Sequence, residues 1–161
     1  MDTRLDVVDL QILKDLQADG RMTNVKLAEN AGISAPPCLR RVRALEESGV
    51  IEGYHATLNS KALGFQVIIF AQVGLSSQSD ADLRAFEAKV HQWPLVRECH
   101  MIAGEADFFL KIVARNWDEY QQFHSQQLTT LPIVASVKSI LVIRTAKQQS
   151  GIPVDLVKVE N

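Results

Sequence analysis

Three arginines stand close together in the first third of the chain, within the four-residue run RRVR. A guanidinium group can hold a phosphate through two parallel hydrogen bonds, or the O6 and N7 atoms of guanine when it reaches a base edge. A lysine ammonium offers the charge without this fork. The alternative is that the arginines only solvate an exposed helix face and pair with Glu46 and Glu47, as charge runs usually do. The run alone leaves both interpretations open for Arg40, Arg41 and Arg43.

The charge around these arginines is unevenly distributed, although the 161-residue chain as a whole has a formal net charge of −2 at pH 7. A nucleic-acid-binding domain is usually basic overall, so only local charge could support that role here. Between Gly20 and Leu45 the single acidic residue is Glu29, whereas the three arginines are joined by Arg21 and Lys26. This separation suits a DNA-binding surface, because attraction to phosphate acts over about 8–10 Å in physiological salt.

The arginines lie in the third of three short helical patterns. Apolar residues at helical spacing predict a first helix over residues 5–20, and Thr23 and Gly32 suit the two ends of a second. Ser34 can cap the third helix, whose first turn tolerates prolines, although the proline rule for the preceding residue favours a start near Pro37. The tight turn NAGISAP predicts a helix-turn-helix, whose second helix enters the major groove of DNA.

The pattern changes beyond a boundary near residues 50–65, where VIEGYHATLN fits a strand or an extended connection. The remaining apolar runs and amphipathic segments give the order strand-helix-strand-strand-helix-strand, the split βαβ arrangement of ferredoxin-like domains. We therefore predict an α+β protein. Its parts are a winged-helix-like helix-turn-helix domain at residues 1–52, a linker at 53–65, a ferredoxin-like domain at 66–147 and a tail at 148–161.

Two long stretches of the chain resemble the Lrp/AsnC family of bacterial and archaeal transcription factors. LDVVDLQILKDLQADGRMTNVKLAENAGIS, followed by PPCLRRVRALEESGVIEGY, resembles that family's DNA-binding domain, and RECHMIAGEADFFLKI resembles the signature of its ligand-sensing domain. The resemblance covers about residues 5–147, with two specific motifs in the right order. It implies a homodimer, often assembled into octamers, that binds double-stranded DNA and responds to an amino acid or related metabolite. It further implies sequence-specific control of amino-acid metabolism or transport.

The resemblance also assigns expected roles to particular residues of this chain. The positions that it implies for DNA binding are Thr23, Ser34, Pro36, Arg40, Arg41 and Arg43. The positions that it implies for effector binding, on a loop and on the last strand beside the same cleft, are Gly104, Glu105, Asp107, Ser136 and Ser139.

The chain departs from the family pattern near the implied effector site. Ala106 stands where many members have an aromatic residue, Ile133 where glycine is common, and Val137 where a threonine often stands. Each change alters pocket size or hydrogen bonding, so the effector's identity is not carried over. On the residues alone, GEAD is also explained as a tight turn that needs glycine, with Asp107 bonded to its own backbone.

An enzyme is the main alternative from another functional class, and the residues argue against it. Cys99 and His100 are adjacent in a predicted strand, so they point to opposite faces and do not form a nucleophile and base pair. The four histidines lack the spacing of metal ligands, which argues against a metal cluster of His100, Glu105 and Asp107, the other candidate for catalysis. We predict no catalysis, no metal and no cofactor, with an amino acid as effector.

Two further alternatives concern how the chain binds its partners. A sensing module that never acts on DNA is disfavoured, because a complete helix-turn-helix precedes the second domain. Trp93 and Trp117 flank predicted helices and are expected to anchor the core, since nothing suggests a platform for stacking bases.

The chain carries no signal for a membrane or an oxidising compartment. It has no apolar run of about twenty residues, and its acidic, amphipathic start differs from a signal peptide. Cys38 and Cys99 are far apart in sequence and are expected to be free thiols. We therefore predict a cytoplasmic protein without a membrane partner.

Overall fold

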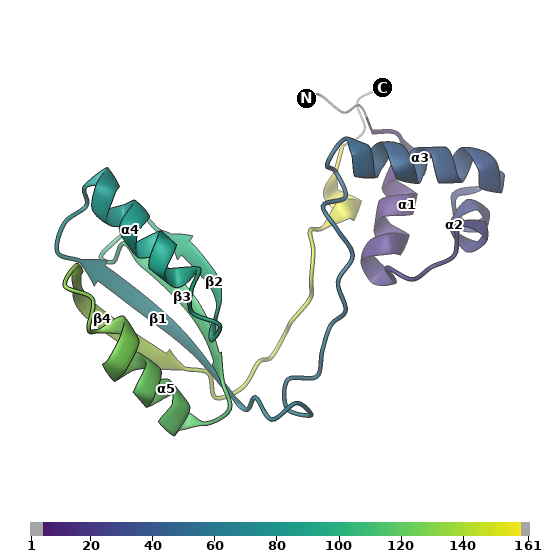
Figure 1. Ribbon diagram of the computed structural model, residues 1–161. Coiled ribbons are helices and arrows are strands. Elements are labelled where there is room, and N and C mark those ends of the chain that lie inside the picture. The colour runs from purple at the N-terminus through teal and green to yellow at the C-terminus, as the bar shows by residue number, and fades with distance from the viewer. Residues whose placement is uncertain (1–4, 159–161) are drawn as a thin grey trace. The chain divides into compact units, whose positions relative to one another are not determined.

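The computed structural model describes residues 5–158 of the chain, and Figure 1 shows its helices and strands. The chain folds into two compact units. The first contains the residues up to Thr57 together with those from Lys147 on, and the second runs from Leu58 to Ala146. The predicted α+β class is confirmed, because the first unit is helical and the second contains a four-stranded sheet. Within the described residues, no helix has the length and apolar character needed to cross a bilayer.

Three helices build most of the first unit: α1 (Val7–Ala18), α2 (Asn24–Ala31) and α3 (Ala35–Glu47). They enclose a small core whose buried members are Ile12, Leu27, Ala28, Cys38 and Leu45. The start of α1 is fixed by a reciprocal cap, in which the Asp6 carboxylate accepts the N–H groups of Val8 and Asp9, both at 2.9 Å. The Asp9 carboxylate in turn accepts the Asp6 N–H at 3.1 Å. These bonds satisfy donors that the first turn of a helix leaves without partners.

The structure corrects one sequence-based expectation about the start of the third helix and decides another about the segment that follows it. The third helix begins at Ala35 and includes both prolines in its first turn. The helix therefore begins before the expected start near Pro37. A proline lacks only the amide hydrogen, and the first turn of a helix does not use that hydrogen in an intrahelical bond. Residues 50–59 form no strand, so of the two alternatives that the sequence left open for them the extended connection is the one observed.

The last described residues belong to the first unit as well. A single turn of 3-10 helix, η2 (Val154–Leu156), contacts α1 and buries the side chain of Val154. The sequence predicted only a tail here, without an element.

The second unit is a four-stranded antiparallel sheet in the order β2-β3-β1-β4. Its strands are β1 (Val67–Leu75), β2 (Val96–Met101), β3 (Phe108–Ala114) and β4 (Val134–Leu141). Two helices, α4 (Asp80–Val90) and α5 (Trp117–Phe123), connect the strands as the ferredoxin-like prediction requires. After α5 the chain continues as one π-helical segment, η1 (His124–Leu128).

The two faces of this sheet differ in what covers them. Both helices lie on one face (Figure 1), and the alternate residues of β1 and β3 that point toward them are buried, including Ile69 and Leu110. On the opposite face, Phe70 and Phe109 stack with ring centroids 5.2 Å apart and remain partly exposed. No element of the described second unit covers this face.

Candidate DNA-binding and effector-binding sites

The turn between α2 and α3 is held by side chains at the two helix starts. Thr23 precedes α2, and its hydroxyl accepts the Lys26 N–H at 3.3 Å. The Asn24 side chain donates to the carbonyl oxygen of Ala35 at 2.8 Å, which connects the first turn of α2 to the first turn of α3. This bond fixes where the third helix begins relative to the second.

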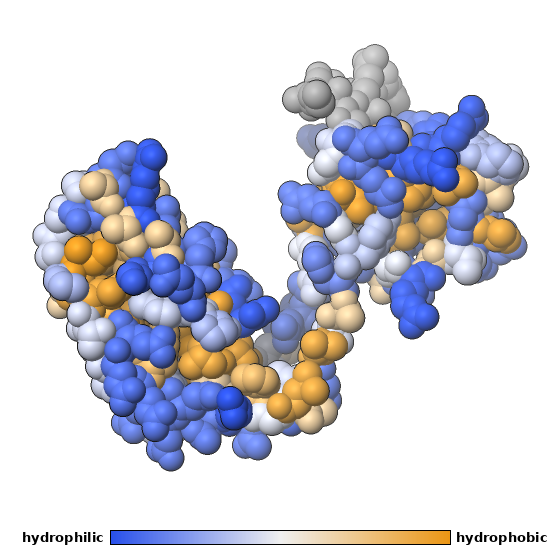
Figure 2. Space-filling view, in the orientation of Figure 1, coloured by the Kyte–Doolittle hydropathy of each residue, from blue (hydrophilic) through white to orange (hydrophobic). Residues whose placement is uncertain are grey.

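The arginines of α3 fall into two groups. Arg40 and Arg43 are exposed and lie three residues apart, so they share one helix face with Pro36, which is also exposed. Figure 2 shows strongly hydrophilic side chains gathered over α3. This face can present two guanidinium forks to a phosphate or to a base edge.

Arg41 points to α1 instead. Its Nη1 atom lies 2.8 Å from the Asp6 Oδ2 atom and 2.8 Å from the Asp9 Oδ1 atom. Of the three arginines of α3, only Arg41 forms ion pairs with residues that the structure describes. The pKa of Asp6 is lowered, first by the hydrogen bond from the Asp9 N–H and further by Arg41. The two aspartates raise the pKa of Arg41 in turn. Sequence reasoning grouped three arginines, and the structure separates this one from the other two.

The first turn of α3 offers few backbone donors to an anion. Pro36 and Pro37 have no N–H, and the Cys38 N–H already donates to the Ser34 carbonyl oxygen. Ser34 occupies the N-cap position, but its hydroxyl makes no capping bond. A phosphate near this helix start would therefore depend on side chains, namely the Ser34 hydroxyl and the arginines.

In the second unit, the GEAD loop joins β2 to β3 and is held by its aspartate. The Asp107 carboxylate accepts the Leu75 N–H and the Gln78 side-chain amide, each at 2.7 Å, and the Asp107 N–H donates to Val73. The Asp107 carboxylate therefore bonds to the end of β1 and the segment that follows it, and not to the backbone of its own turn as the alternative interpretation proposed. Gly104 and Glu105 are exposed.

The two predicted effector serines of β4 do not share a face. Ser136 lies beside Gly74, where an added Cβ would stand 2.6 Å from the serine Oγ atom, so this close approach needs glycine. Gly74 adjoins Leu75, the partner of Asp107, and the structure thus brings Ser136 to the GEAD end of the sheet. Ser139 pairs with buried Ala71, and its hydroxyl bonds to the Tyr120 hydroxyl on the helix-covered face.

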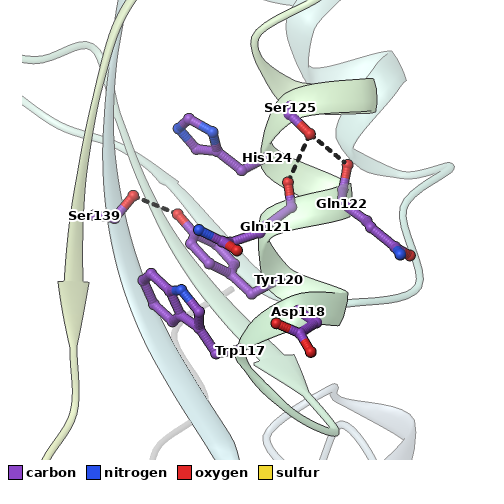
Figure 3. A pocket seen from close by; sticks show the side chains of 8 residues that line it. All are labelled: Trp117, Asp118, Tyr120, Gln121, Gln122, His124, Ser125 and Ser139. Carbon is purple, nitrogen blue, oxygen red and sulfur yellow. Dashed lines mark hydrogen bonds between the residues drawn. The ribbon is translucent and has the colours of Figure 1, made fainter.

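Ser139 lines a cavity beside α5, drawn in Figure 3. Its volume is about 610 Å³, and its lining is Trp117, Asp118, Tyr120, Gln121, Gln122, His124, Ser125 and Ser139. No lysine or arginine is among these residues, so an amino-acid carboxylate would lack a cationic partner there.

Sequence reasoning missed this cavity and misjudged one of its residues. The one sequence signal for the cavity is the helical spacing of the rings at positions 117, 120 and 124, which succeed one another along the helix. Trp117 is 42% exposed, which contradicts its predicted role as a core anchor. Trp93 is buried and contacts Phe86 and Phe123 edge to face, which confirms the same prediction for that residue.

Within the described residues, no group of three or more His, Cys, Asp or Glu side chains is placed to hold a metal ion. Both cysteines are free thiols. Burial raises the pKa of Cys99 to about 11, so this thiol is poorly suited to act as a nucleophile.

Comparisons with known proteins match both units. Residues 5–52 match a family model described as a winged helix-turn-helix DNA-binding domain, and residues 68–152 match the Lrp/AsnC ligand-binding domain. The leucine-responsive regulatory protein of Rhizobium meliloti is 55% identical over 143 residues, which cover 89% of this chain and 92% of that protein. The Bkd operon transcriptional regulator of Pseudomonas aeruginosa is 38% identical over 149 residues, covering 92% and 97% of the two chains.

Solved structures agree with this assignment. A transcriptional regulator from Neisseria meningitidis in complex with L-Met superposes with a TM-score of 0.90 at 30% identity, covering 94% of this chain and 97% of that one. The relatives are transcriptional regulators and not enzymes. The chain therefore belongs to the Lrp/AsnC family of transcriptional regulators, with a helix-turn-helix DNA-binding domain followed by a ferredoxin-like ligand-binding domain.

Proposed function

We propose that the protein binds particular sequences of double-stranded DNA through α3 and that an amino acid or related metabolite modulates this binding or the protein's assembly. By analogy with its relatives, it would act in the cytoplasm and control amino-acid metabolism or transport. The observation that carries the proposal is the pair of exposed guanidinium groups of Arg40 and Arg43 on the second helix of a helix-turn-helix, which form no ion pair with the described residues.

Arg40 and Arg43 would supply the direct contacts to phosphates or guanines. Ser34 and Thr23 would contact the DNA backbone through their hydroxyls, since a hydroxyl that accepts one bond can still donate its own hydrogen. Pro36 would contact the backbone through its exposed ring. Arg41 would act as a positioning residue, because its guanidinium group fixes α3 against the start of α1.

The uncovered sheet face supports a dimer of the second unit. Phe70, Phe109 and the neighbouring apolar residues of β1 and β3 form a face that the helices leave open. A second copy of the same sheet would bury this face, and paired helix-turn-helix units would then contact DNA about 34–36 Å apart, or a multiple of that distance. Assembly of such dimers into octamers remains our proposal from the family resemblance.

The effector site that we propose lies at the GEAD end of the sheet, near Gly104, Glu105, Asp107 and Ser136. A neighbour's complex with L-Met supports an α-amino acid as the ligand class. Glu105 is the exposed carboxylate for an ammonium group, while both Asp107 oxygens already hold the loop and retain spare lone pairs. Ser139 is left out of this site because its hydroxyl is engaged with Tyr120 on the other face.

The DNA part of the proposal is tested with a duplex selected by the wild-type protein. Replacing Arg40 and Arg43 by alanine should weaken binding and reduce the slope of log affinity against log salt by about one for each lost phosphate contact. Arg84→Ala is the matched control, because this exposed arginine lies on α4 and pairs with Asp80. An unchanged slope in the double variant would mean that the two arginines only solvate the helix.

The effector part is tested by unfolding the purified protein in the presence of single amino acids. A ligand that binds only the folded state raises the melting temperature. Glu105→Gln should reduce this rise, whereas Asp118→Asn, which alters the separate cavity of Figure 3, should leave it unchanged. If Asp118→Asn alone removes the rise, the amino acid binds beside α5 and our assignment of the site is wrong.

A further inference from the structure

The chain's last described segment is docked on α1 by two kinds of polar contact. The Gln17 side-chain amide forms a two-way pair with the backbone of Ile152, donating to its carbonyl oxygen at 2.8 Å and accepting its N–H at 3.0 Å. Beyond this pair, the Lys14 ammonium contacts the Asp155 carboxylate at 2.7 Å. Because both partners on α1 lie three residues apart, one helix face holds the tail at two points.

Packing and backbone geometry accompany these contacts. Val154, between the two polar contacts, is only 7% exposed. Gly151 has a φ of 85°, and an added Cβ would collide with the Gln17 side chain. A residue other than glycine would therefore be strained in its backbone and would also push the glutamine away. The docked geometry thus depends on several residues that are far apart in sequence.

The tail gives the first unit a second covalent connection to the second unit. The first connection leaves α3 and enters β1, whereas the second leaves β4 and enters the tail. Val142 is the last residue bonded to the sheet, through its N–H to Ile68, and Ile152 is the first tail residue bonded to α1. The ten peptide units between them span at most roughly 33–36 Å. A unit held by two tethers at different points has fewer accessible orientations than a unit held by one.

We propose that Gln17, Lys14 and Asp155 are positioning residues which, by docking the tail, determine the spacing of DNA half-sites that the assembled protein accepts. The inference rests on the proposed function, since it presumes paired helix-turn-helix units on one duplex. A tethered unit meets its second half-site at an effective concentration that the tether's length and stiffness set. Two tethers raise that concentration at the matching spacing and lower it at other spacings. The docked residues Pro153–Leu156 lie beyond both family-model matches.

The test compares two duplexes for the full-length protein. The first is a duplex selected by the wild type, and the second carries the same half-sites with five base pairs inserted, about half a helical turn. A release variant combines Gln17→Ala with Asp155→Ala, and a matched control combines Gln148→Ala with Gln149→Ala, which alters the same tail before its docked part. Hydrogen exchange at the Ile152 amide reports docking independently of DNA, because that N–H donates to Gln17.

The wild type and the control should bind the inserted duplex at least about tenfold more weakly than the selected one, and the release variant only about threefold more weakly. A chain ending at residue 150 should behave like the release variant, and it serves as the second variant if exchange shows that the substitutions leave the tail docked. The inference is overturned if exchange at Ile152 shows release while the ratio between the duplexes stays at the wild-type value. If the wild type binds no duplex at all, the proposed function fails instead, and the exchange data still show whether the tail docks.

Discussion

The two units are stabilised in different ways. In the described part of the second unit, thirteen buried residues form one continuous core between the sheet and its helices, with several aromatic rings in contact. In the described part of the first unit, the core among the three short helices has five buried residues. This unit adds ion pairs between elements that are distant in sequence, among them Arg41 with Asp6 and Asp9, and Lys14 with Asp155.

This difference follows from size, because a small domain buries a smaller fraction of its surface and gains less from apolar burial. Polar contacts between elements partly compensate, although exposed ion pairs are individually weak. They also orient the helices that carry the DNA-contacting side chains. We therefore expect the first unit to be the less stable of the two and the more sensitive to single substitutions.

The largest expected effect comes from the small core. Ile12→Ala removes a fully buried side chain and should destabilise the first unit by about 2–5 kcal/mol. Both tryptophans lie in the second unit, so their fluorescence follows that unit alone, while far-ultraviolet circular dichroism reports helices in both. The variant should lose part of its helix signal at lower temperature, with the tryptophan transition unchanged.

Leu110→Ala is the reciprocal variant, since this side chain is fully buried in the other core. Leu110→Ala should lower the temperature of the tryptophan transition. The temperature at which the helices of the first unit unfold should stay at its wild-type value. If each substitution shifts both signals equally, the two units unfold as one, and the contrast between their cores has no consequence for stability.

A smaller loss is expected from Arg41→Ala, which leaves two aspartates close together without their shared cation. The Arg41 side chain is 36% exposed and that of Asp9 is 13% exposed, so solvent screens much of the interaction and we expect about 1–2 kcal/mol. DNA binding should weaken mainly because fewer molecules have a folded first unit. At a temperature where the variant is fully folded, its salt slope should equal that of the wild type.

Arg40→Ala provides the contrast within the same helix, with little loss of stability and a shallower salt slope. A salt slope that falls by about one in Arg41→Ala would instead show that this guanidinium leaves its aspartates to contact phosphate.

Much of the fold was predictable because its signals are local. Helical spacing, caps and alternating apolar strands gave the element order, including the split βαβ arrangement that the sheet confirms. The partners of Arg41 were not predictable in this way, because Asp6 lies 35 positions away and the rules for pairs three or four residues apart do not reach it. The docking of Asp155 on Lys14 spans 141 positions and has no periodic signature.

One error could have been avoided from the sequence. Ser136 and Ser139 are three positions apart in a predicted strand, and side chains alternate between faces with a period of two. Their assignment to one cleft was therefore in conflict with strand geometry, as the bond between Ser139 and Tyr120 shows. By contrast, nothing local distinguished the exposed Trp117 from a core residue.

Acid should destabilise the first unit through the cap at the start of α1. The pKa of Asp6 is lowered in the folded protein, chiefly by the hydrogen bond from the Asp9 N–H. The stabilisation from this shift is therefore complete above the pKa of Asp6 in the unfolded chain, about 3.9. It is lost as the pH falls below that value and through the lower pKa that Asp6 has in the folded protein. Asp6→Asn keeps a good N-cap residue but removes the titrating carboxylate. The variant should lose less stability than the wild type between about pH 5 and pH 2.

The measurement is urea unfolding followed by the helix signal at several pH values. Asp118→Asn, in the second unit, should leave the pH dependence of the first unit's transition unchanged. An identical pH dependence in the wild type and Asp6→Asn would show that ionisation of the Asp6 carboxylate contributes nothing to the stability of the first unit.

The smallest expected effect tests whether the second unit also depends on one specific contact, at the proposed effector end of its sheet. Alanine in place of a strand glycine usually adds about 0.5–1 kcal/mol of stability, because it loses less conformational freedom on folding. At Gly74 the new Cβ would stand 2.6 Å from the Ser136 Oγ atom, so the serine must rotate or the strands must separate. Gly74→Ala alone should therefore give no gain, or a loss of up to about 1 kcal/mol.

In the Ser136→Ala background the clash disappears, because the serine Cβ is 4.0 Å from the added atom, and Gly74→Ala should then stabilise the second unit. The tryptophan transition of the four proteins in this double-mutant cycle measures the coupling, which we expect to be about 1 kcal/mol. A coupling near zero would mean that the Ser136 hydroxyl rotates away freely. In that case this end of the sheet is adaptable, and Ser136 is not held in one geometry before an effector arrives.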